Sequence, residues 1–261
     1  MSTAAPEAAD LVLQERHGGV LTITINRPAR KNAVDHEVAV QLAAAVDVLD
    51  ADPELSVGVL TGAGEVFSAG MDLKAFAKGE LPLLPGRGLG GLTRASVRKP
   101  LVAAVEGWAL GGGFELVLAC DLIVAAEDAR FGFPEVMRGL VAAEGGLVKL
   151  PRRLPYHVAA RVLLTGEPLT AAEGKDYGLV NELTPPGAAL DGARELAGCV
   201  ARNAPLALAA VKEVLRETQG LKESDAFRRQ DELTSGLATS EDAREGARAF
   251  AEKRAPVWHG R

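Results

Sequence analysis

The sequence has few of the residues that build disulfide frameworks, zinc sites or histidine-based catalytic groups. Its 261 residues include only two cysteines and four histidines. Cys120 and Cys199 lie far apart and have no neighbours at ligand spacing, so neither a disulfide framework nor a zinc site is expected, and a reducing compartment fits. The histidines show no partner pattern typical of catalysis. We therefore expect no metal.

The chain also lacks a basic excess and a targeting segment. With 29 Lys and Arg against 35 Asp and Glu its net charge is −6, which argues against binding nucleic acid or an anionic membrane by bulk charge. Residues 1–10 show neither a secretion signal nor a transit peptide, so we expect a flexible tail and a cytoplasmic protein. Residues 107–126 are apolar over a membrane's length, but Glu115, Asp121 and three consecutive glycines indicate a buried core segment.

What is present is the composition of a globular protein, 48% apolar and 25% charged. Alternating residues in 12–26 predict two short strands joined by a Gly-Gly turn, and Asp35 is a plausible N-cap for a helix that ends before Pro53. Short apolar runs separated by helical sequence are typical of parallel β/α units, which predicts an α/β fold for the first two thirds of the chain. These predicted strands cover residues 57–61, 101–105 and 122–125.

Two later stretches differ from this pattern. Residues 79–91 contain seven glycines and prolines, which predicts a mobile surface loop rather than a packed element. After about residue 181 the strand signals vanish, and amphipathic helices are expected. They either close their own core or pack against another subunit. The expected helices are 188–202, 205–218, 224–237 and 240–253.

The most unusual local feature is the segment 110–121, where three glycines lead from a strand into an apolar helix with Glu115 in its first turn. Glycine lets a ligand approach the backbone, and the first helical N–H groups have no internal partner, so the turn can hold an oxyanion. Burying a carboxylate among apolar neighbours raises its pKa toward the general acid/base range. The alternative is a packing turn in which Glu115 only compensates the helix dipole.

Two other segments carry candidate groups. Glu135 follows Gly132 and Pro134, which fix a rigid bend; it is either a second acid or an exposed loop residue that begins the next helix. Residues 66–74 form another glycine-containing turn before a short predicted helix. This turn supplies a second oxyanion donor, or else Asp72 is only a helix cap.

Together these segments resemble the crotonase (enoyl-CoA hydratase/isomerase) family over nearly the whole chain. The matching motifs are residues 25–28 with 32–33, 67–73, 107 with 109–115, 131 with 134–135, and 250–254. The resemblance implies an α/β spiral of repeated ββα units and a C-terminal helical region that forms a homotrimer, usually stacked as a homohexamer. We accordingly expect a flexible tail at 1–10, a catalytic core at 11–195 and a trimerisation region at 196–261.

The resemblance also implies the chemistry. The backbone N–H groups of Met71 and Gly112 correspond to the oxyanion hole, and Glu115 and Glu135 to the two hydratase acids. In that mechanism Glu115 helps to activate water for attack at Cβ, and Glu135 delivers a proton to Cα. The implied reaction is the reversible syn addition of water to a trans-2-enoyl-CoA, giving a 3-hydroxyacyl-CoA, with no cofactor beyond the CoA of the substrate.

Contacts to CoA follow from the same resemblance. A basic loop at 27–31 and the stretch 71–74 lie near CoA in relatives, and a lysine near the C-terminus reaches it from a subunit boundary. For each lone basic residue the alternative is a solvated surface charge. The expected binding residues are Arg27, Arg30, Lys31, Ala69, Asp72, Leu73, Lys74, Phe250 and Lys253.

Within the family, Phe114 and the segments 150–155 and 255–261 are most similar to the carnitinyl-CoA dehydratase branch, which makes crotonobetainyl-CoA an alternative substrate. One departure concerns residues 142–146, which read Ala-Ala-Glu-Gly-Gly where hydratases usually have Pro-Gly-Ala-Gly-Gly. The additional carboxylate of Glu144 shapes a polar acyl pocket, contacts a cationic acyl group or points outward; the outward position is the one we expect.

Three other functions are alternatives to this interpretation. The glycine string 86–91 matches a dinucleotide-binding pattern, but no predicted strand precedes it. Ser68 lacks the glycine two positions earlier that a nucleophile elbow requires. A non-catalytic acyl-CoA-binding homologue remains the third alternative.

Overall fold

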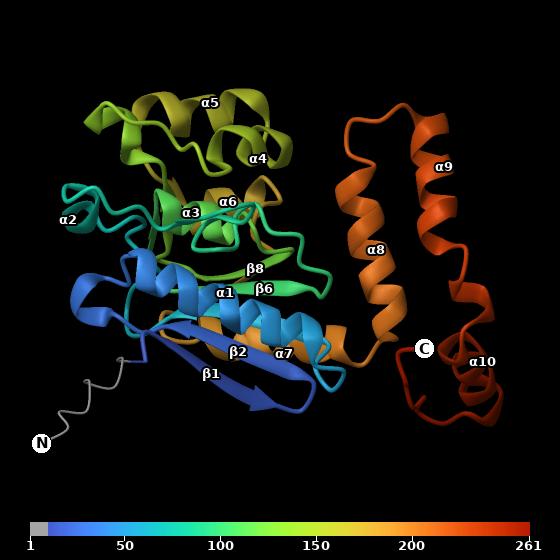
Figure 1. The fold of residues 1–261 in the computed structure, drawn as a ribbon. Helices are drawn as coiled ribbons and strands as arrows, with labels where there is room; N and C mark the ends of the chain where they lie inside the picture. Colours follow the sequence, from blue (N-terminus) through green and yellow to red (C-terminus); the bar gives the residue numbers. More distant parts are fainter. Residues whose placement is uncertain (1–9) are drawn as a thin grey trace, which may run out of the picture.

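A six-stranded sheet forms the centre of the molecule in the computed structural model, which describes residues 10–261 (Figure 1). The tail expected at 1–10 therefore lies, except for Asp10, outside the described residues. The strand order is β1-β2-β3-β6-β8-β11. An antiparallel hairpin begins the sheet and the remaining neighbours pair in parallel, which confirms the predicted α/β class. The strands are β1 (Val12–His17), β2 (Val20–Ile25), β3 (Val57–Gly62), β6 (Leu101–Val105), β8 (Leu122–Ala126) and β11 (Glu182–Thr184).

Both faces of this sheet are covered by helices. Alternate strand residues pack on α1 (His36–Ala51), whose N-cap is Asp35 as predicted, or on α7 (Ala189–Ala201). In β6, for example, Leu101, Ala103 and Val105 belong to the α1 side, and Val102 and Ala104 to the α7 side. Such two-sided burial explains why the parallel strands read as continuous apolar runs.

The rest of the body shares one apolar core with the α1 side of the sheet and carries the candidate site. A three-stranded sheet has the order β10-β9-β7, and the isolated bridge between Ser68 and Ala109 ties the segment before Met71 to β7. The elements here are β7 (Trp108–Leu110), α3 (Gly112–Val117), β9 (Arg130–Gly132), β10 (Leu169–Thr170), α2 (Leu73–Phe76), α4 (Gly146–Arg153), α5 (Tyr156–Thr165), α6 (Ala171–Asp176), and the short 3-10 helices η1 (Pro28–Arg30) and η2 (Pro134–Arg138).

The prediction of an unpacked loop at 79–91 was wrong for its second half. The strands β4 (Leu83–Leu84) and β5 (Gly88–Leu89) pair as a small hairpin, and residues 88–91 are buried. Gly91, at φ +62°, approaches α1 so closely that an added Cβ would lie 2.6 Å from Ala43 Cβ. The glycines that argued against a packed element are thus what allows the packing, because no side chain holds the backbone away.

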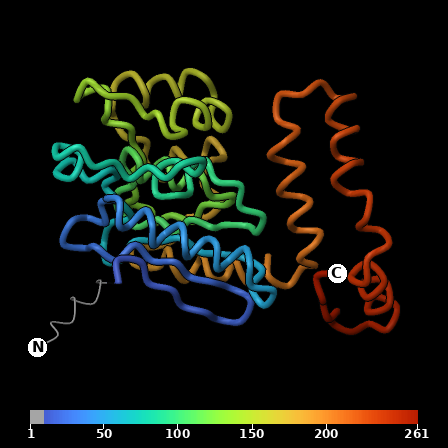
Figure 2. Tube along the Cα trace, in the orientation of Figure 1, coloured from blue at the N-terminus to red at the C-terminus, as the bar shows by residue number. Residues whose placement is uncertain are grey.

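The C-terminal helices extend from one side of the body and contact it through the ion pair of Lys212 with Asp121 (Figures 1 and 2). They are α8 (Pro205–Glu217), α9 (Glu223–Thr234), the 3-10 helix η3 (Leu237–Thr239) and α10 (Glu241–Glu252). The boundary expected between residues 195 and 196 falls inside α7, and the helices that leave the body begin at Pro205. Among residues 10–261, no helix combines the length and apolarity needed to cross a membrane.

Candidate active site

Glu115 lies in the first turn of α3, directly after the glycine turn, and is only 2% exposed. Its Oε1 accepts the backbone N–H groups of Glu144, at 2.7 Å, and Gly146, at 3.0 Å. Gly146 is the first residue of α4, so the carboxylate is held at a helix N-terminus, where negative charge is stabilised. The predicted acid on one helix is therefore oriented by backbone N–H groups at the start of another.

The pKa of Glu115 is raised from 4.5 to about 7, with burial as the largest cause. The N–H groups of Gly146 and Glu144 oppose the rise because they bind the ionised form, whereas the charges of Glu135 and Glu144 add to it. A carboxyl with this pKa is able to take up and release a proton near neutral pH.

Glu135 belongs to η2 and is partly buried. An added Cβ on Gly111 would lie only 2.8 Å from Glu135 Oε1, so the carboxylate faces the turn that begins α3. Its Oε2 is buried and has no hydrogen-bond partner within residues 10–261. Burial raises the pKa of Glu135, and the positive charge of Arg138 opposes this rise without cancelling it. The structure thus places both predicted acids at one site.

The two predicted oxyanion amides also lie on adjacent turns. Gly70, at φ +84°, packs so tightly on the start of α3 that an added Cβ would lie 2.5 Å from Leu110 O and 2.8 Å from Gly112 N. Within the described part of the chain, neither Met71 N–H nor Gly112 N–H donates to a protein acceptor. Two N–H groups are thus left for an external oxygen beside two carboxyls.

The hairpin of β4 and β5 packs beside Gly112. Leu89 Cδ1 lies 2.6 Å from the position that a Cβ on Gly112 would take. The expectation that Glu144 points outward was wrong: its side chain is 15% exposed, its Oε1 lies 2.8 Å from Arg94, and its buried Oε2 faces Gly88. Leu89 and Arg94 are not among the predicted site residues, because nothing in a stretch rich in glycine and proline indicates that it folds back beside Gly112.

The predicted CoA-binding loops lie side by side. Ala69 N–H donates to Lys31 O, and Val34 N–H donates to Gly70 O. Arg30, Lys31, Leu73 and Lys74 are exposed.

Arg27, in contrast, is engaged within the protein. Its guanidinium lies 2.9 Å from Asp35 and 3.2 Å from Asp72, and all three side chains are at most 17% exposed. Asp72 also caps α2 through the N–H groups of Lys74 and Ala75, so the cap interpretation of Asp72 holds as well.

We expect Arg27→Ala to lower the free energy of unfolding by about 3 kcal/mol, because it leaves two largely buried carboxylates without their cation. Denaturant titration measures the change, with the exposed Arg30→Ala as the control, expected to stay within about 0.5 kcal/mol. Unchanged stability together with a raised KM for a CoA thioester would assign Arg27 to ligand binding instead.

Phe250 and Lys253 are not brought to this site within one chain. Phe250 is 87% exposed on α10, and Lys253 follows as its C-cap. Figures 1 and 2 place α10 at the far end of the molecule from α3. Their contact with CoA remains a prediction that requires a second copy of the chain.

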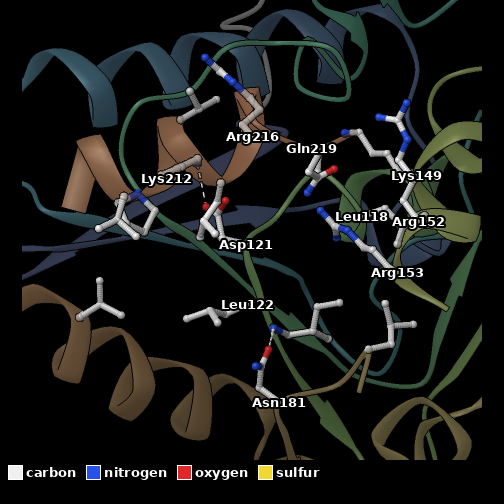
Figure 3. Close-up of a pocket in the computed structure, with 18 of the residues that line it drawn as sticks. Leu118, Asp121, Leu122, Lys149, Arg152, Arg153, Asn181, Lys212, Arg216 and Gln219 are labelled. Carbon is white, nitrogen blue, oxygen red and sulfur yellow. Dashed lines mark hydrogen bonds and ion pairs between the residues drawn. The ribbon is translucent and has the colours of Figure 1, made fainter. Parts of the chain in front are cut away.

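A separate cavity of about 660 Å³ lies between α8 and the body (Figure 3). It contains none of the predicted site residues. An ion pair of Asp121 with Lys212, at 2.7 Å, lies in its wall, and burial lowers the pKa of Lys149 to about 8. In residues 10–261 no cluster of three His, Cys, Asp or Glu side chains is arranged to hold a metal ion.

Known proteins share both this sequence and this fold. Residues 15–261 match the enoyl-CoA hydratase/isomerase family. The chain is 45% identical over 258 residues to a carnitinyl-CoA dehydratase of Citrobacter koseri, covering 94% of this chain and 97% of that one. The solved enoyl-CoA hydratase EchA1 of Mycobacterium marinum has a TM-score of 0.94 and 54% identity, covering 96% of this chain and 99% of that one. A solved carnitinyl-CoA hydratase of Mycobacterium avium has a TM-score of 0.78 and 44% identity, covering 97% and 100%. The chain belongs to the enoyl-CoA hydratase/isomerase (crotonase) family and is an enzyme of hydro-lyase type.

Proposed function

We propose that this enzyme adds water reversibly, on one face, to a trans-2-enoyl-CoA and forms a 3-hydroxyacyl-CoA. The observation that carries the proposal is the meeting of two carboxyls of raised pKa, the buried Glu115 and the partly buried Glu135, with two free backbone amides, those of Met71 and Gly112. A thioester placed on the amides has its reacting carbons beside the acids.

The amides stabilise the charge that develops during the reaction. In the proposed complex the thioester oxygen accepts the N–H groups of Met71 and Gly112, and negative charge accumulates on it as the enolate forms. Such a donor contributes about 3 kcal/mol to the transition state in comparable sites.

Each of the two acids transfers one proton during the addition of water. Ionised Glu115 takes a proton from water as its oxygen bonds to Cβ, and protonated Glu135 gives a proton to Cα. The charge of Glu135 raises the pKa of Glu115, which favours a state in which the pair holds one proton. The proposed chemistry uses only these groups and the CoA thioester, with no separate cofactor.

A second candidate substrate is crotonobetainyl-CoA. It is favoured by the relative named carnitinyl-CoA dehydratase and by a solved relative named carnitinyl-CoA hydratase. A non-catalytic acyl-CoA-binding role is the remaining alternative, and it predicts thermal stabilisation by the thioester without turnover.

We expect the purified protein to lower the ultraviolet absorbance of an enoyl thioester, because hydration removes the conjugated double bond. We expect Glu135→Gln to reduce kcat by roughly 10²- to 10⁴-fold, the range for loss of a general acid. The exposed Glu54→Gln is the matched control, expected to keep wild-type activity. Hydration by a folded Glu135→Gln variant at the wild-type rate would refute the role given to Glu135.

We further propose that the chain works as a homotrimer or homohexamer. The supporting observation is the apolar surface of the C-terminal helices, where Val211, Leu215, Phe227 and Phe250 are each more than half exposed. Exposed apolar surface of this kind is typical of an interface.

A further inference from the structure

Glu144 is next to the catalytic groups but has no part in the proposed mechanism. Its backbone N–H binds Glu115 Oε1 at 2.7 Å, and its charge acts on Glu115. Its side chain leaves the backbone toward the β4–β5 hairpin, on the side where Leu89 covers Gly112. The carboxylate therefore lies against the same hairpin whose Leu89 packs beside Gly112.

The two oxygens of this carboxylate differ. Oε1 is paired with Arg94, which also donates to Ala143 O at 3.0 Å and so fixes the pair to the loop. Oε2 is buried and accepts no hydrogen bond from any of the described residues. A buried carboxylate oxygen without a donor is costly, which favours a ligand that supplies one.

The β4–β5 hairpin adjoins both Oε2 and the turn that carries the oxyanion amide. An added Cβ on Gly88 would lie 2.7 Å from Glu144 Oε2, and Leu89 Cδ1 lies 2.6 Å from the position of an added Cβ on Gly112. A thioester bound at Gly112 in the proposed complex therefore lies close to this hairpin, and with it to Oε2.

Charge decides what kind of acyl group Oε2 accepts. Arg94 already balances the negative charge of Glu144, so the pair does not require a further cation. What Oε2 lacks is a hydrogen-bond donor, and a quaternary ammonium has none to give. A hydroxyl or an N–H group provides one.

We infer that Glu144 is a specificity-determining residue that selects enoyl-CoA substrates with a hydroxyl or N–H group beyond Cβ. The inference rests on the proposed hydration and narrows its substrate class. Arg94 is the positioning residue of the pair, because it acts on the substrate only by holding Oε1.

Four thioesters test this inference: crotonyl-CoA, 4-hydroxycrotonyl-CoA, 5-hydroxy-2-pentenoyl-CoA and crotonobetainyl-CoA. We expect wild-type kcat/KM for one of the hydroxylated thioesters to exceed that for crotonyl-CoA by about 10- to 100-fold, the factor typical of a hydrogen bond to a charged acceptor. Crotonobetainyl-CoA is expected to show no such preference.

The variant Glu144→Gln isolates the contact. Because Arg94 only donates, the amide oxygen stays on Arg94 and the NH₂ takes the place of Oε2, where it repels a donor. We expect the preference for the hydroxylated thioester, taken as the ratio of its kcat/KM to that of crotonyl-CoA in the same variant, to fall to about threefold or less. Glu144→Ala is the second variant, with the same expected loss, and Glu54→Gln is the control that keeps the preference.

The outcomes separate the two proposals. An unchanged preference in folded Glu144→Gln, no preference in the wild type, or a preference for crotonobetainyl-CoA would each overturn the inference while leaving hydration in place. Failure of the wild type to hydrate any of the four thioesters would overturn the proposed function itself.

Discussion

Glu115→Gln is expected to lose about 10³-fold or more in kcat while the protein becomes more stable at alkaline pH. The loss follows because an amide does not accept the proton of the attacking water. The fold is expected to survive, because the amide oxygen of glutamine still accepts the N–H groups of Glu144 and Gly146 that now bind Oε1.

The stability gain follows from the raised pKa of Glu115. Its folded-state pKa is about 7 against an ordinary 4.5, so the folded protein holds the proton more tightly than the unfolded chain. The wild type therefore loses stability as pH rises from about 4.5 through about 7, when the buried carboxyl ionises. Between pH 5 and pH 8 this loss is on the order of 2 kcal/mol, and the uncharged glutamine does not share it.

Denaturant unfolding of both proteins at pH 5 and pH 8 measures this difference. Glu54→Gln is the control, because it makes the same replacement at an exposed side chain. Equal pH dependence in wild type and Glu115→Gln would show that Glu115 is ionised without cost, and full activity of the variant would remove it from the mechanism.

Gly70→Ala is expected to have the second largest effect, lowering kcat by about 10² to 10³-fold, as for loss of an oxyanion donor. Its Cβ would lie 2.5 Å from Leu110 O and 2.8 Å from Gly112 N, and both contacts are to backbone that has no flexible end to move away. The two turns that carry Met71 and Gly112 would be forced apart.

Gly79→Ala is the matched control for this substitution. Gly79 has φ +83°, nearly that of Gly70, but an added Cβ meets nothing within 4 Å. Both variants carry the backbone strain of about 1 kcal/mol, whereas only Gly70→Ala carries the steric conflict. Equal activity of the two variants would show that the separation of the turns does not matter for catalysis.

Much of the fold follows from local patterns in the sequence. The strands at 57–61 and 101–105 are continuous apolar runs because both faces of the sheet are covered, and the helix after Asp35 begins with the cap that its side chain provides. The unusual position of Glu115, a charged residue among apolar neighbours, is likewise apparent from the sequence alone. The family resemblance then supplied the pairing of Glu115 with Glu135, which their spacing of twenty residues permits but does not require.

The wrong predictions for residues 79–91 and for Glu144 have one physical cause, which is contact between segments that are distant in the sequence. The stretch 79–91 reads as a loop because glycine and proline disfavour regular structure, yet Gly90 and Gly91 pack on Leu42 and Ala43 of α1. Glu144 reads as a surface charge because its partner, Arg94, is fifty residues away. No local pattern indicates either contact.

The close fit of Gly70 against the first turn of α3 divides the molecule into a part that tolerates no change and a part that does. Backbone packs on backbone at the proposed oxyanion hole, so the proposed reaction depends on this packing. The proposed acyl side is instead lined by side chains, Leu89 and the Arg94–Glu144 pair, which are not part of that backbone contact. A chain built in this way is able to acquire new substrates while it keeps one reaction.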